Sequence, residues 1–368
     1  MVFSRGLIDE RLEKLRKNAN LGVSDAVFIP VLEGYNWQSC YYFSGFRGSS
    51  GAVIITRDRA FFLTDARYTL QASGEVPFEV VDRKRNRLLD ASVELMKKLS
   101  VKRVGIQGDK IPTTIYWSLK KESEIFDVSR EVATIRRTKS KEEVALIRKA
   151  CELAHLALGR TVNGIKGVKR EKELDALLEY NLAMVGADGG WQDHKFIVAS
   201  GARSALPHGK ASDKEFTEGE WITVDFGARY EGYVCDITRN IFLGEIPKEW
   251  QDRHELLLEA QDAAAQILKP GVKAKDVDWA ARRVLEKAGY EKFFTHGTGH
   301  GIGLDVHESP IVSFSSEDAL QVGDVITLEP GIYVNGVGGM RIEDNYLITP
   351  DGAECISDMI PKNIAAFI

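Results

Sequence analysis

The chain has 368 residues, a length that predicts about two domains, and 44% of its residues are hydrophobic while 28% are charged. This balance is that of an ordinary globular protein, which can bury a large core without the help of disulfides. The formal net charge of −5 argues against nucleic acid or an anionic membrane as the main partner.

Cysteine usage and the amino terminus predict a cytoplasmic protein. The cysteines are scattered and form no C-x-x-C pair, which excludes a zinc knuckle or a redox motif and predicts free thiols: Cys40, Cys151, Cys235 and Cys355. The first residues, MVFSRGLIDERLEKLRKN, lack the apolar stretch of a signal peptide. No apolar run approaches the roughly 18 residues that a membrane span needs.

The first third of the chain alternates helix-like and strand-like segments. Residues 8–19 form an amphipathic pattern, and residues 87–100 also read as a helix. Short apolar runs separated by turns predict strands at residues 25–31, 51–58, 60–65, 78–82 and 103–108. This order of elements predicts a small α/β domain.

The character of the chain changes at residues 130–140, where REVATIRRTKS is polar and basic. Ser140 then precedes Glu143 by three residues, the spacing of a capping box, and predicts the start of a long helix over residues 141–160. We therefore predict one domain over residues 1–133 and a second over residues 134–368.

An internal repeat runs through the second domain at an offset of 104 residues. The tripeptide GVK at 167–169 recurs at 271–273, and EGEWITVDFG at 218–227 aligns with residues 322–331 of the segment QVGDVITLEPG. The alignment places Asp225 on Glu329, an acid on an acid. Two similar α/β lobes are therefore expected to face each other across a pseudo-twofold axis.

Each lobe is predicted to present a pair of carboxylates. If the hairpin over residues 222–238 closes symmetrically about Tyr230 and Glu231, Asp225 falls directly opposite Asp236. A closure about the turn near Gly336 pairs Glu329 with Glu343 in the same way. Carboxylates this close repel each other unless a cation lies between them, and each stands in an apolar strand where an unpaired charge is costly. Four carboxylates in one site are enough to hold two divalent ions.

Three histidines lie between these pairs in the glycine-rich segment THGTGHGIGLDVHESP, at His296, His300 and His307. The glycines exclude a regular helix and let the backbone approach a ligand closely. We expect one of these histidines to bind a metal ion and the other two to contact the substrate. A site of carboxylates with one imidazole favours Mn²⁺ or Co²⁺ over a thiolate-rich zinc site.

Five segments together resemble the Xaa-Pro aminopeptidases, prolidases and methionine aminopeptidases, a metallopeptidase family with the pita-bread fold: LPHGKAS, TVDFGARYEGYVCDITR, THGTGHGIGLDVHESP, ITLEPGIYV and GGMRIED. The resemblance covers the chain from about Arg136 onward. The first part is similar to the creatinase-type α/β domain of aminopeptidase P and prolidase, which methionine aminopeptidases lack. The resemblance thus implies an α/β (α+β) protein with a catalytic pita-bread domain after a smaller creatinase-like domain.

The resemblance also implies a role for each site residue. Asp225, Asp236, His300, Glu329 and Glu343 would hold two divalent ions, with Mn²⁺ expected and Co²⁺ or Zn²⁺ as alternatives, and Asp236 and Glu343 would bridge them. Glu329 would also act as general base toward the attacking water. The remaining roles fall to His208 near the scissile nitrogen, His307 at the carbonyl, His296 at the proline side and Arg341 as an orienting group.

The substrate implied is a proline-containing peptide cleaved before proline, by a homodimer. An aminopeptidase is favoured over a dipeptidase by the segment at residues 43–72, which is similar to the amino-terminal region of Xaa-Pro aminopeptidases. Many microbial prolidases carry an arginine four residues after the histidine of the H-E motif, suited to a dipeptide's carboxylate, whereas this chain has Ile311. Arg341 or a residue from a second subunit could substitute for this arginine.

A peptide-binding module without activity is the remote alternative. Trp191 and His194 are either pocket residues or plain loop residues.

Overall fold

The computed structural model describes residues 2–192 and 194–366 and divides the chain into two compact units, Met1–Arg136 and Arg137–Ile368. Across the described residues, no helix combines the length and the apolar character that a membrane crossing requires. All four cysteines are free thiols, and three of them are buried.

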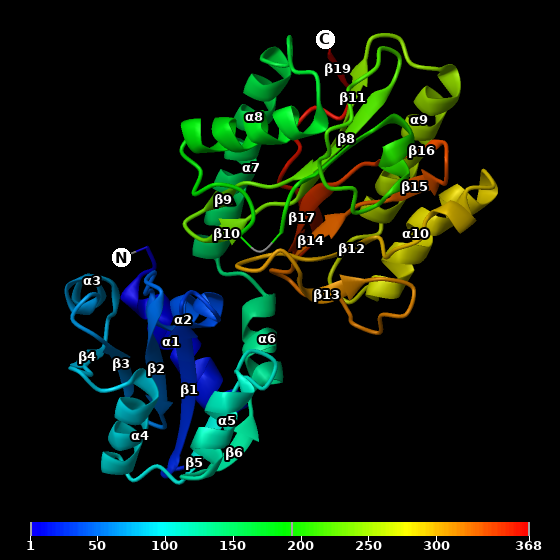
Figure 1. Cartoon of the computed structure of the whole chain (residues 1–368). Coiled ribbons are helices and arrows are strands. Elements are labelled where there is room, and N and C mark those ends of the chain that lie inside the picture. Colours follow the sequence, from blue (N-terminus) through cyan, green and yellow to red (C-terminus); the bar gives the residue numbers. More distant parts are fainter. Residues whose placement is uncertain (1, 193, 367–368) are drawn as a thin grey trace. The chain divides into compact units, whose positions relative to one another are not determined.

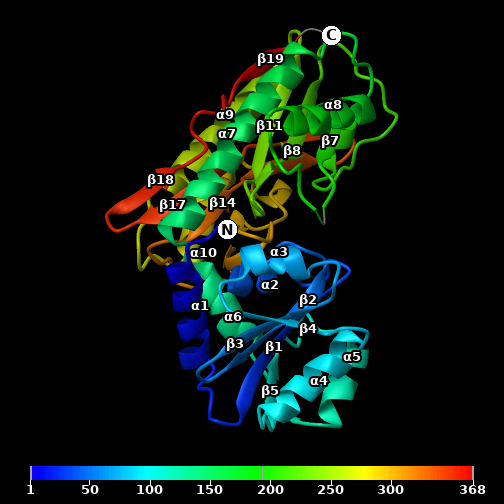
Figure 2. The same ribbon diagram turned by 90° about the vertical axis from the view of Figure 1, so that its left-hand side faces the viewer.

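The first unit is built on a mixed sheet with the strand order β4-β3-β2-β1-β5-β6. Strand β1 runs antiparallel to β2 and parallel to β5. Helices α4 and α5 lie on one side of this sheet, and α1 lies on the other (Figure 2). The strands are β1 (Asp25–Leu32), β2 (Ser50–Thr56), β3 (Ala60–Thr64), β4 (Glu79–Asp82), β5 (Arg103–Ile106) and β6 (Glu124–Asp127), and the helices are α1 (Arg5–Asn18), α2 (Trp37–Ser44), α3 (Thr69–Glu75), α4 (Leu88–Lys98), α5 (Thr113–Lys120) and α6 (Ser129–Arg137).

The α/β prediction for this unit is confirmed, and the polar stretch before residue 140, for which no element was predicted, forms helix α6. Helix α6 is amphipathic, and its apolar residues Val132 and Ile135 are buried. The hydroxyl of Tyr42 donates a hydrogen bond of 3.1 Å to the carbonyl of Ile135. Two buried apolar residues are few for periodicity to be recognised among so many charges, so the sequence predicted no element there.

Within the described residues, the second unit contains two larger sheets, with the orders β19-β11-β8-β7 and β13-β12-β14-β17-β18, and two two-stranded sheets, β10-β9 and β15-β16. Helices α7 and α8 flank the strands on one side and α9 and α10 on the other (Figure 1). The helices are α7 (Lys141–Asn163), α8 (Glu171–Met184), α9 (Lys248–Ala265) and α10 (Ala274–Lys287). The strands are β7 (Ile197–Ser200), β8 (Trp221–Phe226), β9 (Arg229–Tyr230), β10 (Tyr233–Val234), β11 (Ile237–Leu243), β12 (Gly299–Gly301), β13 (Glu308–Val312), β14 (Val325–Leu328), β15 (Gly331–Val334), β16 (Gly338–Arg341), β17 (Asp344–Thr349), β18 (Gly352–Cys355) and β19 (Ile364–Ala366).

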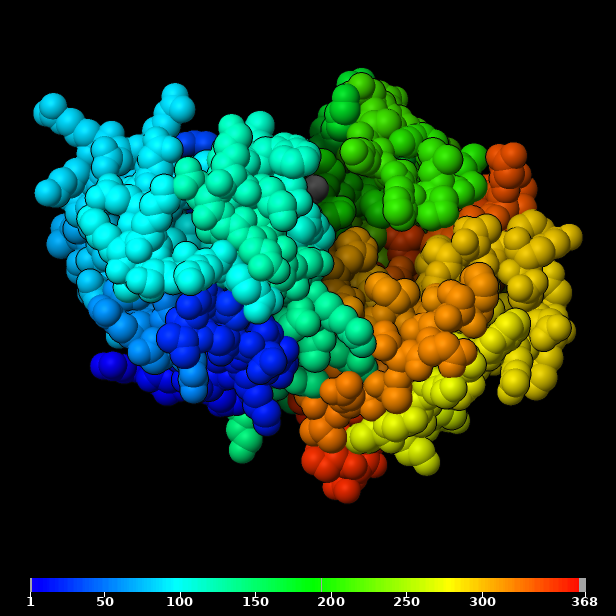
Figure 3. Space-filling model, turned by 90° about the horizontal axis from the view of Figure 1, so that it is seen from below, coloured from blue at the N-terminus to red at the C-terminus, as the bar shows by residue number. Residues whose placement is uncertain are grey.

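Helix α7 begins as predicted, because the Ser140 side chain accepts from the Glu143 amide and the Glu143 carboxylate accepts from the Ser140 amide. The other helices bury apolar faces against the sheets. Leu257, Ala260 and Ala264 of α9 and Val277 and Ala281 of α10 belong to one buried cluster with strands of the second half. The yellow residues of α10 lie beside the orange residues around β13 (Figure 3).

The two halves of this unit repeat each other as the sequence predicts. Strand β8 aligns with β14 at the offset of 104, and the turn glycines that precede them, Gly219 and Gly323, both have positive φ angles, +81° and +91°. A side chain at either position would be strained, because L-residues rarely adopt this conformation. The repeat is therefore carried by turn geometry as well as by apolar pattern.

The predicted pairing of Asp225 with Asp236 is wrong by two residues. The ladder pairs Asp225 with Thr238, and the inner hairpin pairs Tyr230 with Tyr233. The turn is therefore made by Glu231 and Gly232, which have φ angles of +49° and +83°. A two-residue turn of this kind matches the twist of the strands, so it is favoured over the symmetric closure assumed from sequence. The second hairpin follows the predicted register, since Leu328 pairs with Asp344 and Gly331 with Arg341.

Candidate metal centre

One cavity of about 620 Å³ in the second unit is lined by all nine residues that the sequence analysis singled out. They are Asp225, Asp236, His300, Glu329 and Glu343, the predicted ligands, and His208, His296, His307 and Arg341, the predicted catalytic and orienting groups. Trp191, His194 and Ile311 line the same cavity, so the first two are pocket residues and not merely loop residues.

The four carboxylates reach the cavity from the ends of four neighbouring strands. Asp225 lies near the end of β8, Asp236 directly before β11, Glu329 directly after β14 and Glu343 directly before β17. Glu343 is 2% exposed and Asp236 4% exposed. The two halves join here, because the Glu343 amide donates to the carbonyl of Thr238 at 3.2 Å and the Thr238 hydroxyl donates to Glu343 Oε2 at 2.7 Å.

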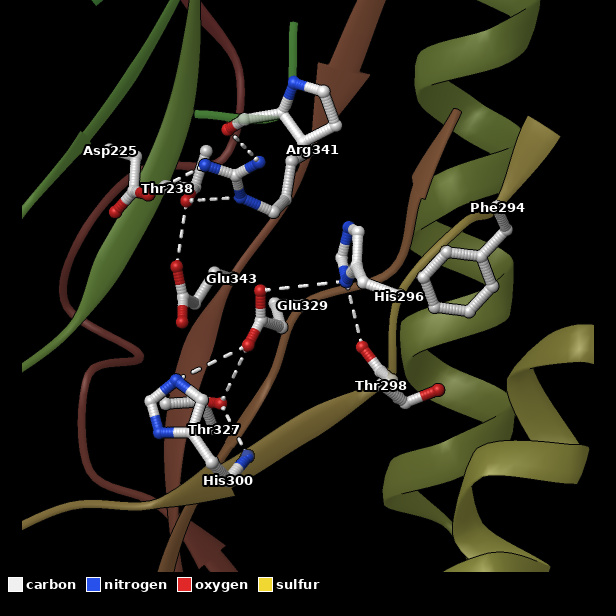
Figure 4. A network of polar contacts seen from close by, with 12 residues as sticks. Asp225, Thr238, Phe294, His296, Thr298, His300, Thr327, Glu329, Arg341 and Glu343 are labelled. Atoms are coloured by element: carbon white, nitrogen blue, oxygen red, sulfur yellow. Dashed lines mark hydrogen bonds and ion pairs between the residues drawn. The ribbon is translucent and has the colours of Figure 1, made fainter. Parts of the chain in front are cut away.

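His300 is held in the tautomer that a metal ligand needs. Its Nδ1 lies 3.0 Å from the carbonyl oxygen of Gly301, which can only accept, so Nδ1 carries the proton. The unprotonated Nε2 then points at two carboxylates, 3.3 Å from Glu329 Oε1 and 3.7 Å from Asp236 Oδ2. Burial lowers the pKa of His300 to about 3, so the ring stays neutral. Figure 4 shows Glu329 between this ring and that of His296.

Without a cation, the ionised form of these clustered carboxylates is unfavourable. Burial, followed by repulsion from Glu343 and Asp225, raises the pKa of Asp236 well above its usual range. The pKa of Glu343 rises for the same reasons, and burial raises that of Glu329 to about 7. Removing an ionised carboxylate from water costs several kcal/mol unless an opposite charge compensates it. The shifts therefore mark a site that favours either protons or cations.

Two buried carboxylate oxygen atoms without a hydrogen-bond partner in the described part of the chain also favour the binding of a cation. Among the described residues, neither Asp225 Oδ1 nor Asp236 Oδ1 has a hydrogen-bond partner. One ligand atom each from Asp236, His300 and Glu343 lies within 4.8 Å of the other two, a separation that one ion can bridge. Oxygen donors with a single imidazole suit a hard divalent ion. The residues present thus fit the predicted metal.

The two other predicted carboxylate ligands, Asp225 and Glu329, are held by neighbouring side chains. Asp225 Oδ2 accepts a 2.6 Å hydrogen bond from Arg341 Nη2, which leaves Oδ1 facing inward. Glu329 Oε1 accepts from the Thr327 hydroxyl at 3.4 Å, and its Oε2 lies 3.9 Å from His296 Nδ1. Asp225 and Glu329 therefore each have one oxygen atom that already accepts a hydrogen bond from a neighbouring side chain.

A chain of hydrogen bonds connects Arg341 to His296. Arg341 Nη1 donates to the hydroxyl oxygen of Tyr333 at 2.6 Å, and this hydroxyl lies 2.9 Å from His296 Nε2. His296 Nδ1 donates to the carbonyl of Gly297, so Nε2 accepts the proton of Tyr333. Burial lowers the pKa of His296 to about 3 and raises that of Tyr333 to about 12. Burial therefore keeps both groups neutral, and the hydrogen bonds fix their orientation.

Several supporting residues were missed from the sequence. Asp278 of α10 accepts from the amide and hydroxyl of Thr298, both at 2.8 Å, and forms an ion pair with Arg282, which donates to the carbonyl of His296. The Asn345 side chain holds both backbone groups of Asp236. Tyr333 stood in the quoted segment ITLEPGIYV and could have been found there. Asp278 and Arg282 looked like an ordinary i, i+4 pair on a helix surface, so no signal marked them.

The remaining histidines form the outer part of the cavity. The His307 ring lies 4.3 Å from that of His300 and 5.3 Å from that of His194, measured between centroids. Burial, with the nearby His194, lowers the pKa of His307, so this ring is also neutral near pH 7. His208 is exposed within the cavity wall, where it is free to contact a ligand.

Comparison with known proteins agrees with this geometry. The model of metallopeptidase family M24 matches residues 145–350, and that of the creatinase/prolidase N-terminal domain matches residues 11–138. The Xaa-Pro dipeptidase of Pyrococcus furiosus is 39% identical over 94% of this chain and 97% of its own length. The X-Pro aminopeptidase of Thermotoga maritima superposes with a TM-score of 0.89 at 38% identity, over 96% of this chain and all of that one. The Xaa-Pro dipeptidase of Bacillus anthracis also gives 0.89, at 34% identity, over 98% of this chain and all of that one.

The chain therefore belongs to metallopeptidase family M24 and carries the creatinase/prolidase-type domain ahead of its peptidase domain. The predictions of the family, of the pita-bread fold and of a metal-dependent hydrolase are confirmed.

Proposed function

We propose that this chain is an Xaa-Pro dipeptidase, which hydrolyses the bond before proline in a dipeptide. The observation that carries the proposal is the buried carboxylate group around the Nε2 of His300, in a chain 39% identical to the Pyrococcus furiosus Xaa-Pro dipeptidase over nearly its whole length. The sequence alone favoured an aminopeptidase, but the relatives named Xaa-Pro dipeptidase support the dipeptidase better.

The proposed ligands of two divalent ions, with Mn²⁺ expected, are Asp225, Asp236, His300, Glu329 and Glu343. The ligand atoms of Asp236, His300 and Glu343 lie within 4.8 Å of one another, and Asp236 and Glu343 would help to hold both ions. When bound, such ions supply Lewis-acid polarisation of the substrate carbonyl and make the attacking water more acidic.

Glu329 is the proposed general base. Without a cation, burial raises its pKa to about 7, and a bound cation would favour the ionised form, which is the form that accepts a proton. Its Oε1 faces Nε2 of His300, and its Oε2 faces His296, so the carboxylate stands at the centre of the cavity wall. A proton taken from the attacking water would pass to the leaving nitrogen of proline.

Three histidines complete the proposal. His307 beside His300 would donate to the carbonyl oxygen as it gains negative charge, and His208 would assist the leaving amine. His296, fixed through Tyr333 and Arg341, would line the proline side of the cavity. The lowered pKa values of His296 and His307 keep these two rings uncharged before the reaction.

An Xaa-Pro aminopeptidase is the second candidate. Ile311 lines the cavity where an arginine would hold the free carboxylate of a dipeptide, and it is 48% exposed. The 38% identity to the Thermotoga maritima X-Pro aminopeptidase points in the same direction. A cavity without a carboxylate clamp would accept a peptide that continues beyond proline.

A comparison of substrates separates the two candidates. The purified protein with added Mn²⁺ is assayed with Ala-Pro and with Ala-Pro-Ala, and the bound metal is measured by mass spectrometry. A dipeptidase cleaves Ala-Pro with the higher kcat/KM and binds two ions per chain. A higher kcat/KM for the tripeptide would make the chain an aminopeptidase, and the absence of both cleavage and bound metal would refute an enzymatic role.

A further inference from the structure

The cavity is lined by three basic side chains, those of Lys195, Lys210 and Arg341. Only a group that is not already paired can bind an anionic part of a substrate without losing an existing contact. The three residues differ in this respect.

Arg341 is fully engaged. Its Nε donates to the Thr238 hydroxyl at 3.0 Å, its Nη1 to the Tyr333 hydroxyl, and its Nη2 to Asp225 Oδ2 at 2.6 Å. It is buried, with 3% of its surface exposed. Moving it toward a substrate would leave the Asp225 carboxylate buried and unpaired, which is costly. Arg341 therefore does not substitute for the clamp that is absent at Ile311.

Of the two lysines, Lys195 already faces an acid, with its Nζ 3.8 Å from Glu179 Oε1. In the portion of the chain that the structure describes, Lys210 Nζ makes no ion pair or hydrogen bond. Its backbone, by contrast, is fixed: the Lys210 carbonyl accepts from Arg203 Nη2 at 2.9 Å, and the residue forms an isolated antiparallel bridge with Ile197. Lys210 therefore has a backbone that is held in place and, among the described residues, an ammonium group without an anionic partner.

Lys210 also stands at a suitable distance from the reacting bond. It follows His208 by two residues, which limits the separation of their Cα atoms to about 7 Å. His208 is the group proposed to lie at the scissile nitrogen. In an Xaa-Pro dipeptide the carboxylate carbon is only two bonds from that nitrogen. A lysine stem of four methylenes spans such a gap, and its ammonium group forms charge-assisted hydrogen bonds with a carboxylate.

We propose that Lys210 binds the C-terminal carboxylate of an Xaa-Pro dipeptide and so makes the cavity selective for dipeptides. The inference rests on the proposed function, because it assigns a residue to the free carboxylate of that substrate. A longer peptide presents a neutral amide at this point and gains no ionic contact. Lys210 therefore takes over the task that the apolar Ile311 cannot perform.

The test compares Ala-Pro with its amide, Ala-Pro-NH₂, which differ only in the terminal charge. In Lys210→Met, the ratio of kcat/KM for Ala-Pro to that for the amide is expected to fall by about tenfold or more, mainly through KM, because a hydrogen bond to a charged group is lost. Lys210→Arg should retain most of the ratio. Lys195→Met is the matched control, since it removes another lysine of the same cavity and should leave the ratio unchanged.

Product binding provides a second readout that does not depend on turnover. Proline carries the carboxylate and prolinamide does not, so competitive inhibition by proline should weaken about tenfold in Lys210→Met, while inhibition by prolinamide should not. Bound Mn²⁺ is measured for every variant, so that a loss of metal is not mistaken for a loss of substrate binding.

The outcomes separate the inference from the function on which it rests. A wild-type protein that cleaves Ala-Pro no better than Ala-Pro-Ala overturns the proposed dipeptidase before any variant is made. A wild-type protein that prefers Ala-Pro, together with an unchanged ratio in metal-loaded Lys210→Met, overturns the role of Lys210 and leaves the dipeptidase standing.

Discussion

Replacing Asp236 by Asn tests the metal centre most directly, since it removes one charge and keeps the size of the side chain. Asp236 and Glu343 have ligand atoms within 4.8 Å of each other, so two ionised carboxylates there repel by about 3.5 kcal/mol at an effective dielectric constant near 20. Burial adds to this repulsion and favours the protonated form of Asp236, which Asn mimics. The metal-free variant is therefore expected to match the metal-free wild type in stability within about 1 kcal/mol.

Adding Mn²⁺ should stabilise the wild type more than Asp236→Asn. An ion present at 100 times its dissociation constant stabilises the folded state by about 2.7 kcal/mol. For a unit of the size of residues 137–368, this corresponds to a rise in Tm of roughly 5–11 °C. The wild type should show this rise and lose it on chelation, whereas Asp236→Asn should show little of it, bind fewer than two ions per chain and have no measurable peptidase activity.

The measurements are differential scanning fluorimetry with and without Mn²⁺, and metal content by mass spectrometry. Asp324→Asn is the matched control, because Asp324 is equally buried but forms an ion pair with Arg137 away from the cavity. Breaking that buried pair should cost about 3–5 kcal/mol while leaving the metal content at two ions. Full metal content and activity in Asp236→Asn would refute the ligand assignment, and a large loss of stability without metal would indicate a structural role.

Three further substitutions address single groups. Glu329→Gln should lower kcat at least about 100-fold, and an activity within a few-fold of wild type would exclude it as the base. Arg341→Met leaves Asp225 without its partner, so urea unfolding should show a loss of about 3–5 kcal/mol; an unchanged midpoint would contradict the importance of this pair. Burial lowers the pKa of His254, so the folded state stays neutral while the unfolded chain takes up a proton below about pH 6.5. The wild type should therefore lose up to about 1.4 kcal/mol per pH unit on acidification, and His254→Gln should show a shallower slope; equal slopes would contradict the assignment.

The sequence was informative wherever a local rule has one solution. The capping box at Ser140 and Glu143 fixes the start of α7, and the offset of 104 relates β8 to β14. Seven of the nine site residues stood out because acids and histidines in apolar, glycine-rich strands have few structural explanations, whereas His208 and Arg341 were implied only by the family resemblance. All nine line one cavity.

The sequence was less informative where the answer depends on a turn or on a distant element. Two closures of the first hairpin differ only by moving the turn one residue, and the choice depends on whether Glu231 accepts a positive φ angle, which it does at +49°. The network of Tyr333 and Asp278 depends on contacts with His296 and Thr298, which are 37 and 20 residues away along the chain. No periodic pattern within one element encodes such a distance.

The corrected register also changes which residues of the two halves are equivalent. Glu343 lies opposite Glu329, whereas Asp225 faces Thr238, so Thr238 rather than Asp236 corresponds to Glu343. By the same register Asp236 lies opposite Gly227, and Arg341 pairs with Gly331, so Asp236 corresponds to Arg341.

The metal centre is therefore not a symmetric set of four carboxylates. A fully symmetric site would carry either two more acids or two fewer, because Thr238 and Arg341 stand where acids stand in the other half. Instead, Thr238 donates to Glu343 and Arg341 donates to Asp225, so each non-acidic member holds one of the carboxylates. The repeat supplies equivalent backbone positions at the junction of the sheets. The departure from symmetry divides these positions between the proposed ligands of the ions and the side chains that hold those ligands in place.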